Sequence, residues 1–172
     1  MKVTEEMISE NMRREGNMFR MLFHPDNEKR FRRVQKLVTT FKKGSKPHNS
    51  QVVKEEVFIP RRDGKQIRVC IYKPKDLDPN QPVTGLLWNH GGGYAFGVPE
   101  VCTETYEKII TSSPTVIVAP DYRLSIEAPF PAAFEDSYDT LLWMKDNAER
   151  LGIHKDQLFV GGESAGGGLT CC

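Results

Sequence analysis

The chain has 172 residues, of which 38% are hydrophobic and 27% charged, a composition typical of one soluble globular domain. Its 24 basic and 23 acidic side chains leave a formal net charge of +1, so the charge balance provides no attraction toward nucleic acid or an anionic membrane. Charged residues recur through positions 1–23 and leave no apolar run long enough for a signal peptide or a membrane span. We therefore expect a cytoplasmic protein whose partner is a small molecule.

The cysteines give no sign of a metal centre. Cys70, Cys102, Cys171 and Cys172 do not have metal-ligand spacing, and the adjacent pair at the end is poorly placed for a structural disulfide. We expect four reduced thiols, and nothing in the sequence implies a metal or an organic cofactor.

The N-terminal part of the chain has helical periodicity. From Thr4 to about Thr40, apolar residues recur mostly at steps of three and four. The stretch His24–Asn27 contains a proline and interrupts this pattern, which predicts two helices. A polar, turn-rich run then follows at Lys42–Ser50. We expect a helical N-terminal segment over residues 1–50 and a second domain over residues 51–172.

The second domain alternates strands with helices. Five short apolar runs predict strands: Val57–Ile59, Ile67–Tyr72, Thr84–Trp88, Thr115–Ala119 and Leu158–Val160. Two longer segments, Glu100–Ser112 and Ala132–Arg150, have the spacing of amphipathic helices. The pattern predicts an α/β fold with a mostly parallel sheet covered on both faces. The turn Arg61–Gly64 predicts an antiparallel hairpin of the first two strands at the sheet edge.

A Gly-x-Ser-x-Gly motif spans Gly162–Gly166, between the last predicted strand and a predicted helix start. A serine on such a sharp strand-to-helix turn is held in strained backbone angles with its hydroxyl exposed, and glycines beside it allow other backbone to approach closely. This context makes Ser164 a candidate nucleophile. Taken alone, the five-residue motif also fits a Gly/Ser-rich turn without chemistry.

Three consecutive glycines, Gly91–Gly93, follow His90 directly after a predicted buried strand. Glycines cost backbone entropy on folding, so this loop requires bare and freely positioned N–H groups. In an acyl-transfer enzyme, amides of such a loop and the amide after the nucleophile stabilise the oxyanion, which points to Gly92, Gly93 and Ala165. The alternatives are a flexible loop or a phosphate cradle. The cradle is the weaker of these because no Gly-Lys-Ser/Thr sequence is present.

Three blocks in this order resemble the hormone-sensitive-lipase-like family of α/β-hydrolases: His90–Gly93, Asp121–Ala133 and Gly162–Gly167. The resemblance covers roughly residues 54 to 172, and the helical N-terminal segment is similar to the family's cap, which covers the substrate pocket. Type-B carboxylesterases carry similar first and third blocks, and the second block separates the two groups. Within it, Ile126 and Ala128 depart from the usual form, which affects local loop shape.

The resemblance implies a carboxylic-ester hydrolase working through an acyl-enzyme on a small-molecule ester. It implies the following roles: Ser164 as nucleophile; Gly92, Gly93 and Ala165 as the oxyanion hole; His90 and Gly91 as supports of the loop; and Glu163 as an orienting neighbour. Because the triad acid and base follow the serine in this fold, the earlier Asp121 and Asp136 are expected to be structural.

No histidine follows Ser164, and only eight residues remain after it. We therefore expect the chain to be the N-terminal fragment of a longer polypeptide that supplies the triad acid and base, with little turnover by the fragment alone. His24, His48 and His154 are expected in solvated loops. The alternative function is a non-catalytic small-molecule-binding protein on a hydrolase scaffold, and amide or lactone hydrolysis by the same groups also remains open.

Overall fold

The computed structural model describes residues 4–22, 28–78 and 80–172. The chain forms two compact units, Met1–Thr40 and Phe41–Cys172. The first contains η1 (Glu5–Met7), α1 (Glu10–Leu22) and most of α2 (Glu28–Lys42). Two helices are therefore present as predicted, and their predicted interruption at residues 24–27, which includes His24, lies outside the described residues. The role of the first 50 residues as a cap stays a prediction.

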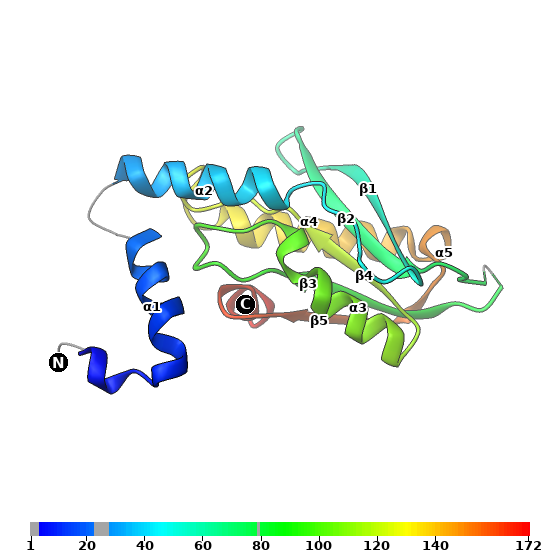
Figure 1. Ribbon diagram of the computed structural model, residues 1–172. Coiled ribbons are helices and arrows are strands. Elements are labelled where there is room, and N and C mark those ends of the chain that lie inside the picture. The colour runs from blue at the N-terminus through cyan, green and yellow to red at the C-terminus, as the bar shows by residue number, and fades with distance from the viewer. Residues whose placement is uncertain (1–3, 23–27, 79) are drawn as a thin grey trace. The chain divides into compact units, whose positions relative to one another are not determined.

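The second unit is built on a five-stranded sheet (Figure 1). Its strands are β1 (Val52–Pro60), β2 (Gln66–Pro74), β3 (Val83–Asn89), β4 (Thr115–Pro120) and β5 (Ile153–Gly162), in the spatial order β1-β2-β4-β3-β5. Strands β3, β4 and β5 are parallel, whereas β1 and β2 form an antiparallel hairpin at one edge, as predicted. Gly64, at φ 80°, adopts the left-handed conformation that the hairpin turn requires.

Strand β5 begins earlier than the apolar run at Leu158 indicates. Ile153 pairs with Val83 at the start of β3, and the amide of Val83 donates to the carbonyl of Gly152 at 2.9 Å. His154, expected in a loop, therefore lies inside the strand and is half-buried. Between Ile153 and Leu158 the pairing with β3 is irregular and Lys155, Asp156 and Gln157 are all exposed, so no alternation of apolar residues marks this part of the strand in the sequence.

Both predicted helical segments are present, but each is divided. The first consists of a short 3₁₀ turn, η2 (Pro99–Cys102), followed by α3 (Thr103–Ser112). The second consists of α4 (Ala132–Asp146) and α5 (Ala148–Leu151), separated at Asn147, whose side-chain amide donates to the carbonyl of Trp143 at 2.8 Å. A last helix, α6 (Ala165–Thr170), follows β5. None of the helices in the described ranges has both the length and the apolar composition needed to span a bilayer.

Helices cover both faces of the sheet, as predicted (Figure 1). Alternate residues of a strand point to opposite faces, and β4 shows this clearly: Val116 and Val118 pack in one core, and Ile117 and Ala119 in the other. The first core includes Met144 of α4, and the second is closed by α3. This packing fixes the carboxyl ends of β3 and β5, where the candidate site lies.

Candidate active site

Ser164 lies on a sharp turn between β5 and α6. Its backbone angles, φ 51° and ψ −119°, fall in a region that non-glycine residues rarely adopt, and its side chain is exposed. Such strain persists only where the surrounding structure imposes it, and it is concentrated at functional sites. The turn therefore has the geometry of a nucleophile elbow.

The glycines on either side of Ser164 allow two backbone segments to touch. A β-carbon on Gly162 would lie 2.6 Å from the carbonyl of Gly166 and 2.8 Å from the carbonyl oxygen of Asn89. A β-carbon on Gly166 would collide with the same Asn89 oxygen and lie 2.6 Å from the oxygen of His90. Glycine is thus required at both positions, because the elbow packs directly against the end of β3.

The loop after β3 is shaped by two glycines in left-handed conformations, Gly92 at φ 126° and Gly93 at φ 60°. The carbonyl of Gly92 accepts hydrogen bonds from the amides of Ala95 and Phe96 at 3.1 and 2.9 Å, which closes a tight turn. A side chain on Gly92 would strike the carbonyl oxygen of Phe96. A residue with a side chain at Gly92 could not adopt this backbone conformation without strain, so the turn requires glycine there.

The backbone amides of Gly92, Gly93 and Ala165 are among those near the turn that have no acceptor within the described residues. Gly91, one residue before them, packs against the elbow, since a β-carbon there would lie 3.1 Å from the carbonyl oxygen of Glu163. The structure therefore brings the glycine loop and the serine turn together. Amides at such a place are suited to hold a developing negative charge.

His90 is buried and packs inside the loop. Its ring stacks on Tyr122, with centroids 4.2 Å apart and planes 10° from parallel, and its Nδ1–H donates to the carbonyl of Gly91 at 2.8 Å. The Tyr122 hydroxyl donates to the carbonyl of His90 at 2.7 Å. Burial lowers the pKa of His90, so the imidazole is neutral near pH 7. Through these contacts, His90 packs the start of the glycine loop against Tyr122.

Glu163 connects the elbow to η2. Its Oε1 accepts a hydrogen bond from the Cys102 thiol at 3.2 Å. Burial, together with this carboxylate, raises the pKa of Cys102 to about 12, so the thiol stays protonated and able to donate. The Glu163 side chain also lies beside Gly91, where a β-carbon would be 3.2 Å from its Cγ. Glu163 thus contacts the glycine loop from the serine turn.

A buried ionic cluster supports η2, the turn that ends the glycine loop. Glu100 accepts from Arg68 at 2.8 and 3.0 Å, from Lys54 at 3.2 Å and from the amide of Gly44 at 2.8 Å. Ligand atoms of Glu56, Cys70 and Glu100 lie within 4.8 Å of one another, a spacing that could hold a metal ion. Arg68 and Lys54 already form ion pairs with Glu100, and their positive charges would repel a metal ion at this place.

Glu100 gives a prediction for stability against pH. Burial alone would raise its pKa, but the hydrogen bonds from Arg68 and Gly44 outweigh burial and lower the pKa to about 2. Because the folded-state pKa lies below the ordinary glutamate value of 4.5, this group's stabilisation is present above about pH 5 and lost as the pH falls toward 2. The contribution is about 3 kcal/mol.

Glu100→Gln is therefore expected to flatten the fall of unfolding free energy between pH 5 and pH 2 and to lower stability at pH 7, as measured by urea denaturation. Glu104→Gln, which changes an exposed glutamate on α3, is the matched control and should keep the wild-type slope. Equal slopes for the wild type and Glu100→Gln would contradict this account of the cluster.

The carboxylates that precede Ser164 are held by arginines. Asp136 is buried and accepts from Arg123 Nε and Nη2, each at 2.8 Å. Asp121 accepts from Arg68 at 2.9 Å and from Lys43 at 3.1 Å. Both carboxylates stabilise loops, as predicted. Among the described residues, no histidine hydrogen-bonds to Ser164.

A family model described as the alpha/beta hydrolase fold matches residues 86–172, which contain both the glycine loop and the serine turn. The chain belongs to this α/β-hydrolase family. It is 35% identical over 119 residues to an AB hydrolase superfamily protein of Schizosaccharomyces pombe, an alignment covering 67% of this chain and 35% of that one. It is 33% identical over 115 residues to ethyl acetate hydrolase of Pseudomonas putida, covering 67% and 36%.

Among solved structures, the α/β-hydrolase chain is similar to a hyperthermophilic esterase from the archaeon Pyrobaculum calidifontis, with a TM-score of 0.72 and 30% identity. That match covers 95% of this chain and 51% of the esterase. The relatives and structural neighbours include esterases and carboxylesterases of the same fold. The chain spans about a third of the length of the curated relatives it matches.

Some residues of this α/β-hydrolase site have no signal that singles them out in the sequence. Cys102, which holds Glu163, is 61 residues away along the chain and lies at the start of a helix. Asn89 accepts a hydrogen bond from Ser137 at 2.9 Å and presents its carbonyl to Gly166. Its place directly before His90 is the one available hint, because a polar residue ends an otherwise apolar strand there.

Proposed function

We propose that this protein is a serine-dependent carboxylic-ester hydrolase whose nucleophile is Ser164. The observation that carries the proposal is the strained Ser164 turn packed against a glycine loop whose amides lack acceptors in the described structure. The hydrolase and esterase relatives support the same reaction class. Because the chain spans about a third of those relatives, the activity is proposed for the protein expressed from its whole coding region.

The proposed reaction has two steps. The Ser164 oxygen attacks the ester carbonyl carbon while a base removes its proton, and the carbonyl oxygen becomes an oxyanion held by the amides of Gly92, Gly93 and Ala165. The C–O bond to the alcohol then breaks, and the alcohol leaves with that proton. Water attacks the acyl-enzyme by the same path and releases the acid. Each oxyanion donor in such a hole lowers the activation free energy by roughly 3–4 kcal/mol.

The general base of this mechanism is not His90. That imidazole is buried and stacked on Tyr122, its Nδ1–H is hydrogen-bonded to Gly91, and no hydrogen bond joins it to Ser164 among the described residues. Chain order in this fold places the acid and then the histidine after the nucleophile. We assign both to the part of the relatives' length that these 172 residues do not span.

The remaining predicted residues act by positioning. His90 and Gly91 hold the shape of the glycine loop, and Glu163 links that loop to the serine turn through Gly91 and Cys102. The proposed substrate is a small-molecule ester.

The test is hydrolysis of p-nitrophenyl butyrate by the protein expressed from its whole coding region, together with the sequence downstream of Cys172. Release of p-nitrophenol, with an aspartate or glutamate and then a histidine downstream, is the expected result. No hydrolysis of p-nitrophenyl esters from acetate to octanoate, with that histidine substituted, would instead favour a binding protein on the hydrolase scaffold.

A further inference from the structure

The glycine loop after His90 returns to its own start before η2 begins. Gly97 has φ 100°, and a β-carbon there would lie 2.6 Å from Nδ1 of His90 and 2.8 Å from the carbonyl oxygen of Gly91. The loop is therefore closed at its base, and η2 follows directly from this closed base. Cys102 is the last residue of η2. Its side chain is placed to act on both ends of the loop.

Glu163 contacts the glycine loop and η2 from the serine turn. A β-carbon on Gly91 would lie 3.4 Å from Glu163 Oε1, the same oxygen that accepts from the Cys102 thiol at 3.2 Å. The backbone of Glu163 belongs to the serine turn, because its carbonyl accepts from the amide of Gly166 at 2.8 Å. One carboxylate oxygen thus meets the start of the loop and the end of η2, and it belongs to the residue directly before the nucleophile.

The Cys102 sulfur has polar hydrogens on its other sides. Cys102 is 2% exposed, in a core that includes Tyr106 and is packed against Trp88. The Tyr106 hydroxyl and Trp88 Nε1 are buried and have no hydrogen-bond partner within the described part of the chain. Both lie close enough to the sulfur to lower the pKa of the thiol, although burial and Glu163 raise that pKa to about 12. The thiol keeps its proton, and the Glu163 carboxylate is the acceptor that faces it.

The thiol determines where the Glu163 side chain points. Glu163 is exposed, and a surface glutamate has several side-chain conformations of similar energy. Cys102 is the hydrogen-bond donor to its carboxylate among the residues that the structure describes. A hydrogen bond to an ionised carboxylate is stronger than one between neutral groups, so it selects the conformation that lies over Gly91.

We infer that Cys102 is a positioning residue for the ester hydrolysis proposed above, an inference that rests on that function. Its thiol holds Glu163 over Gly91, and this contact sets how far the loop amides stand from the Ser164 oxygen. Those amides meet a full negative charge only after Ser164 has attacked the ester. Because a displacement of about 1 Å can cost a hundredfold in rate, loss of the thiol is expected to lower kcat and to leave KM nearly unchanged.

The first test replaces the thiol in the protein expressed from its whole coding region. Cys102→Ala is expected to lower kcat for p-nitrophenyl butyrate roughly tenfold, with KM within about twofold of the wild type. Cys102→Ser retains a proton donor and should stay within about threefold of the wild-type kcat. Cys70→Ala is the matched control: it removes a buried thiol from the same core, one whose sulfur accepts from Arg68 at 3.2 Å, and should keep the wild-type kcat.

Circular dichroism and urea denaturation show whether each variant folds. If Cys102→Ala does not fold, Cys102→Val decides, because valine fills the space of the thiol and donates no proton. It is expected to show the same loss of kcat.

A double-mutant cycle tests whether Cys102 acts through Glu163. Glu163→Ala is expected to lower kcat by itself. Adding Cys102→Ala to that variant should change kcat by less than about twofold, because the carboxylate that the thiol holds is already absent. A general packing role of Cys102 would produce the full loss in both backgrounds.

Trifluoromethyl pentyl ketone reports on the oxyanion separately from turnover. The Ser164 oxygen bonds to its carbonyl carbon, the carbonyl π electrons move to the oxygen, and the enzyme's base takes the hydroxyl proton. The resulting adduct resembles the transition state, so its Ki is expected to rise roughly tenfold in Cys102→Ala, in step with the loss of kcat. The Ki of butyrate, the product acid, should stay at the wild-type value.

Four results would overturn the inference while leaving Ser164-dependent hydrolysis in place. These are a wild-type kcat in folded Cys102→Ala, equal losses in Cys102→Ala and Cys70→Ala, equal losses in Cys102→Ala and Cys102→Ser, and a full further loss in the Glu163→Ala background. A wild-type protein without Ser164-dependent hydrolysis would instead remove the esterase proposal, and the positioning role with it.

Discussion

Ser164→Ala is expected to lower kcat for p-nitrophenyl butyrate roughly 10⁴- to 10⁶-fold in the protein expressed from its whole coding region. The alanine removes the attacking oxygen, so no acyl-enzyme forms. The remaining rate would come from water attacking an ester held by the amides of Gly92, Gly93 and Ala165. The fold should be unaffected, because the Ser164 side chain is exposed and its backbone carbonyl still accepts from Gly168 at 3.2 Å.

Ser113→Ala is the matched control for that measurement. Ser113 is also an exposed serine beside a helix end, at the C-cap of α3, but in ordinary extended backbone. It should keep the wild-type rate. If Ser164→Ala retained most of the activity while remaining folded, the nucleophile would have to lie elsewhere in the protein.

Gly166→Ala is expected to destabilise the fold by about 3 kcal/mol and to remove most esterase activity. Its methyl group would collide with the carbonyl oxygen of Asn89 and approach that of His90, so the serine turn and the end of β3 would be forced apart. The glycine loop follows Asn89 directly, and moving it would misplace the proposed oxyanion donors relative to Ser164. Urea denaturation measures the first effect and steady-state kinetics the second.

Gly167→Ala tests whether the effect comes from this contact rather than from losing any glycine in α6. A β-carbon at Gly167 would lie 3.4 Å from the carbonyl oxygen of Gly162, an ordinary van der Waals distance. This variant should stay within about 1 kcal/mol of the wild type. Equal losses in both variants would contradict the close-packing account of the elbow.

The sequence identifies the strands and the serine turn because each has a local cause. The β-branched run at Thr115–Ala119 is typical of a buried strand. In Gly162–Gly166, the glycines have no side chains, which indicates that other backbone packs closely against the serine turn. The extra length of β5 is not encoded in this way. His154 joins the strand because Ile153 meets Val83, which is 70 residues earlier.

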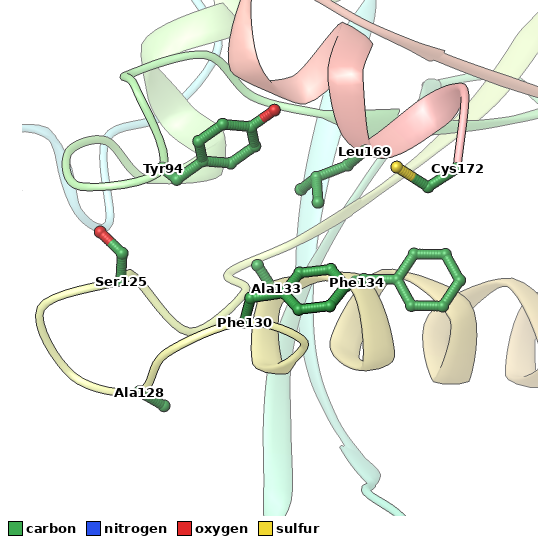
Figure 2. A pocket seen from close by; sticks show the side chains of 8 residues that line it. All are labelled: Tyr94, Ser125, Ala128, Phe130, Ala133, Phe134, Leu169 and Cys172. Carbon is green, nitrogen blue, oxygen red and sulfur yellow. The ribbon is translucent and has the colours of Figure 1, made fainter.

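The supports of the candidate site depend on tertiary contacts that no local pattern reports. The stacking of His90 on Tyr122 joins a loop to a segment 32 residues later, and the Cys102–Glu163 hydrogen bond joins residues that are 61 positions apart. A sequence can say that His90 follows a strand, but its burial depends on which side chains the fold places around it. The pocket lined by Tyr94, Phe134 and Leu169 (Figure 2) is likewise an outcome of packing among three distant segments.

The most direct test of the central claim is covalent trapping of the nucleophile by diethyl p-nitrophenyl phosphate in the protein expressed from its whole coding region. The attacking oxygen bonds to phosphorus, p-nitrophenolate leaves, and the enzyme's base takes the hydroxyl proton, so the chain gains one diethylphosphoryl group. Intact-mass and peptide analysis should find a single adduct on the peptide containing Ser164 and none in Ser164→Ala. An active protein that carried the adduct on any other residue would contradict the assignment of Ser164.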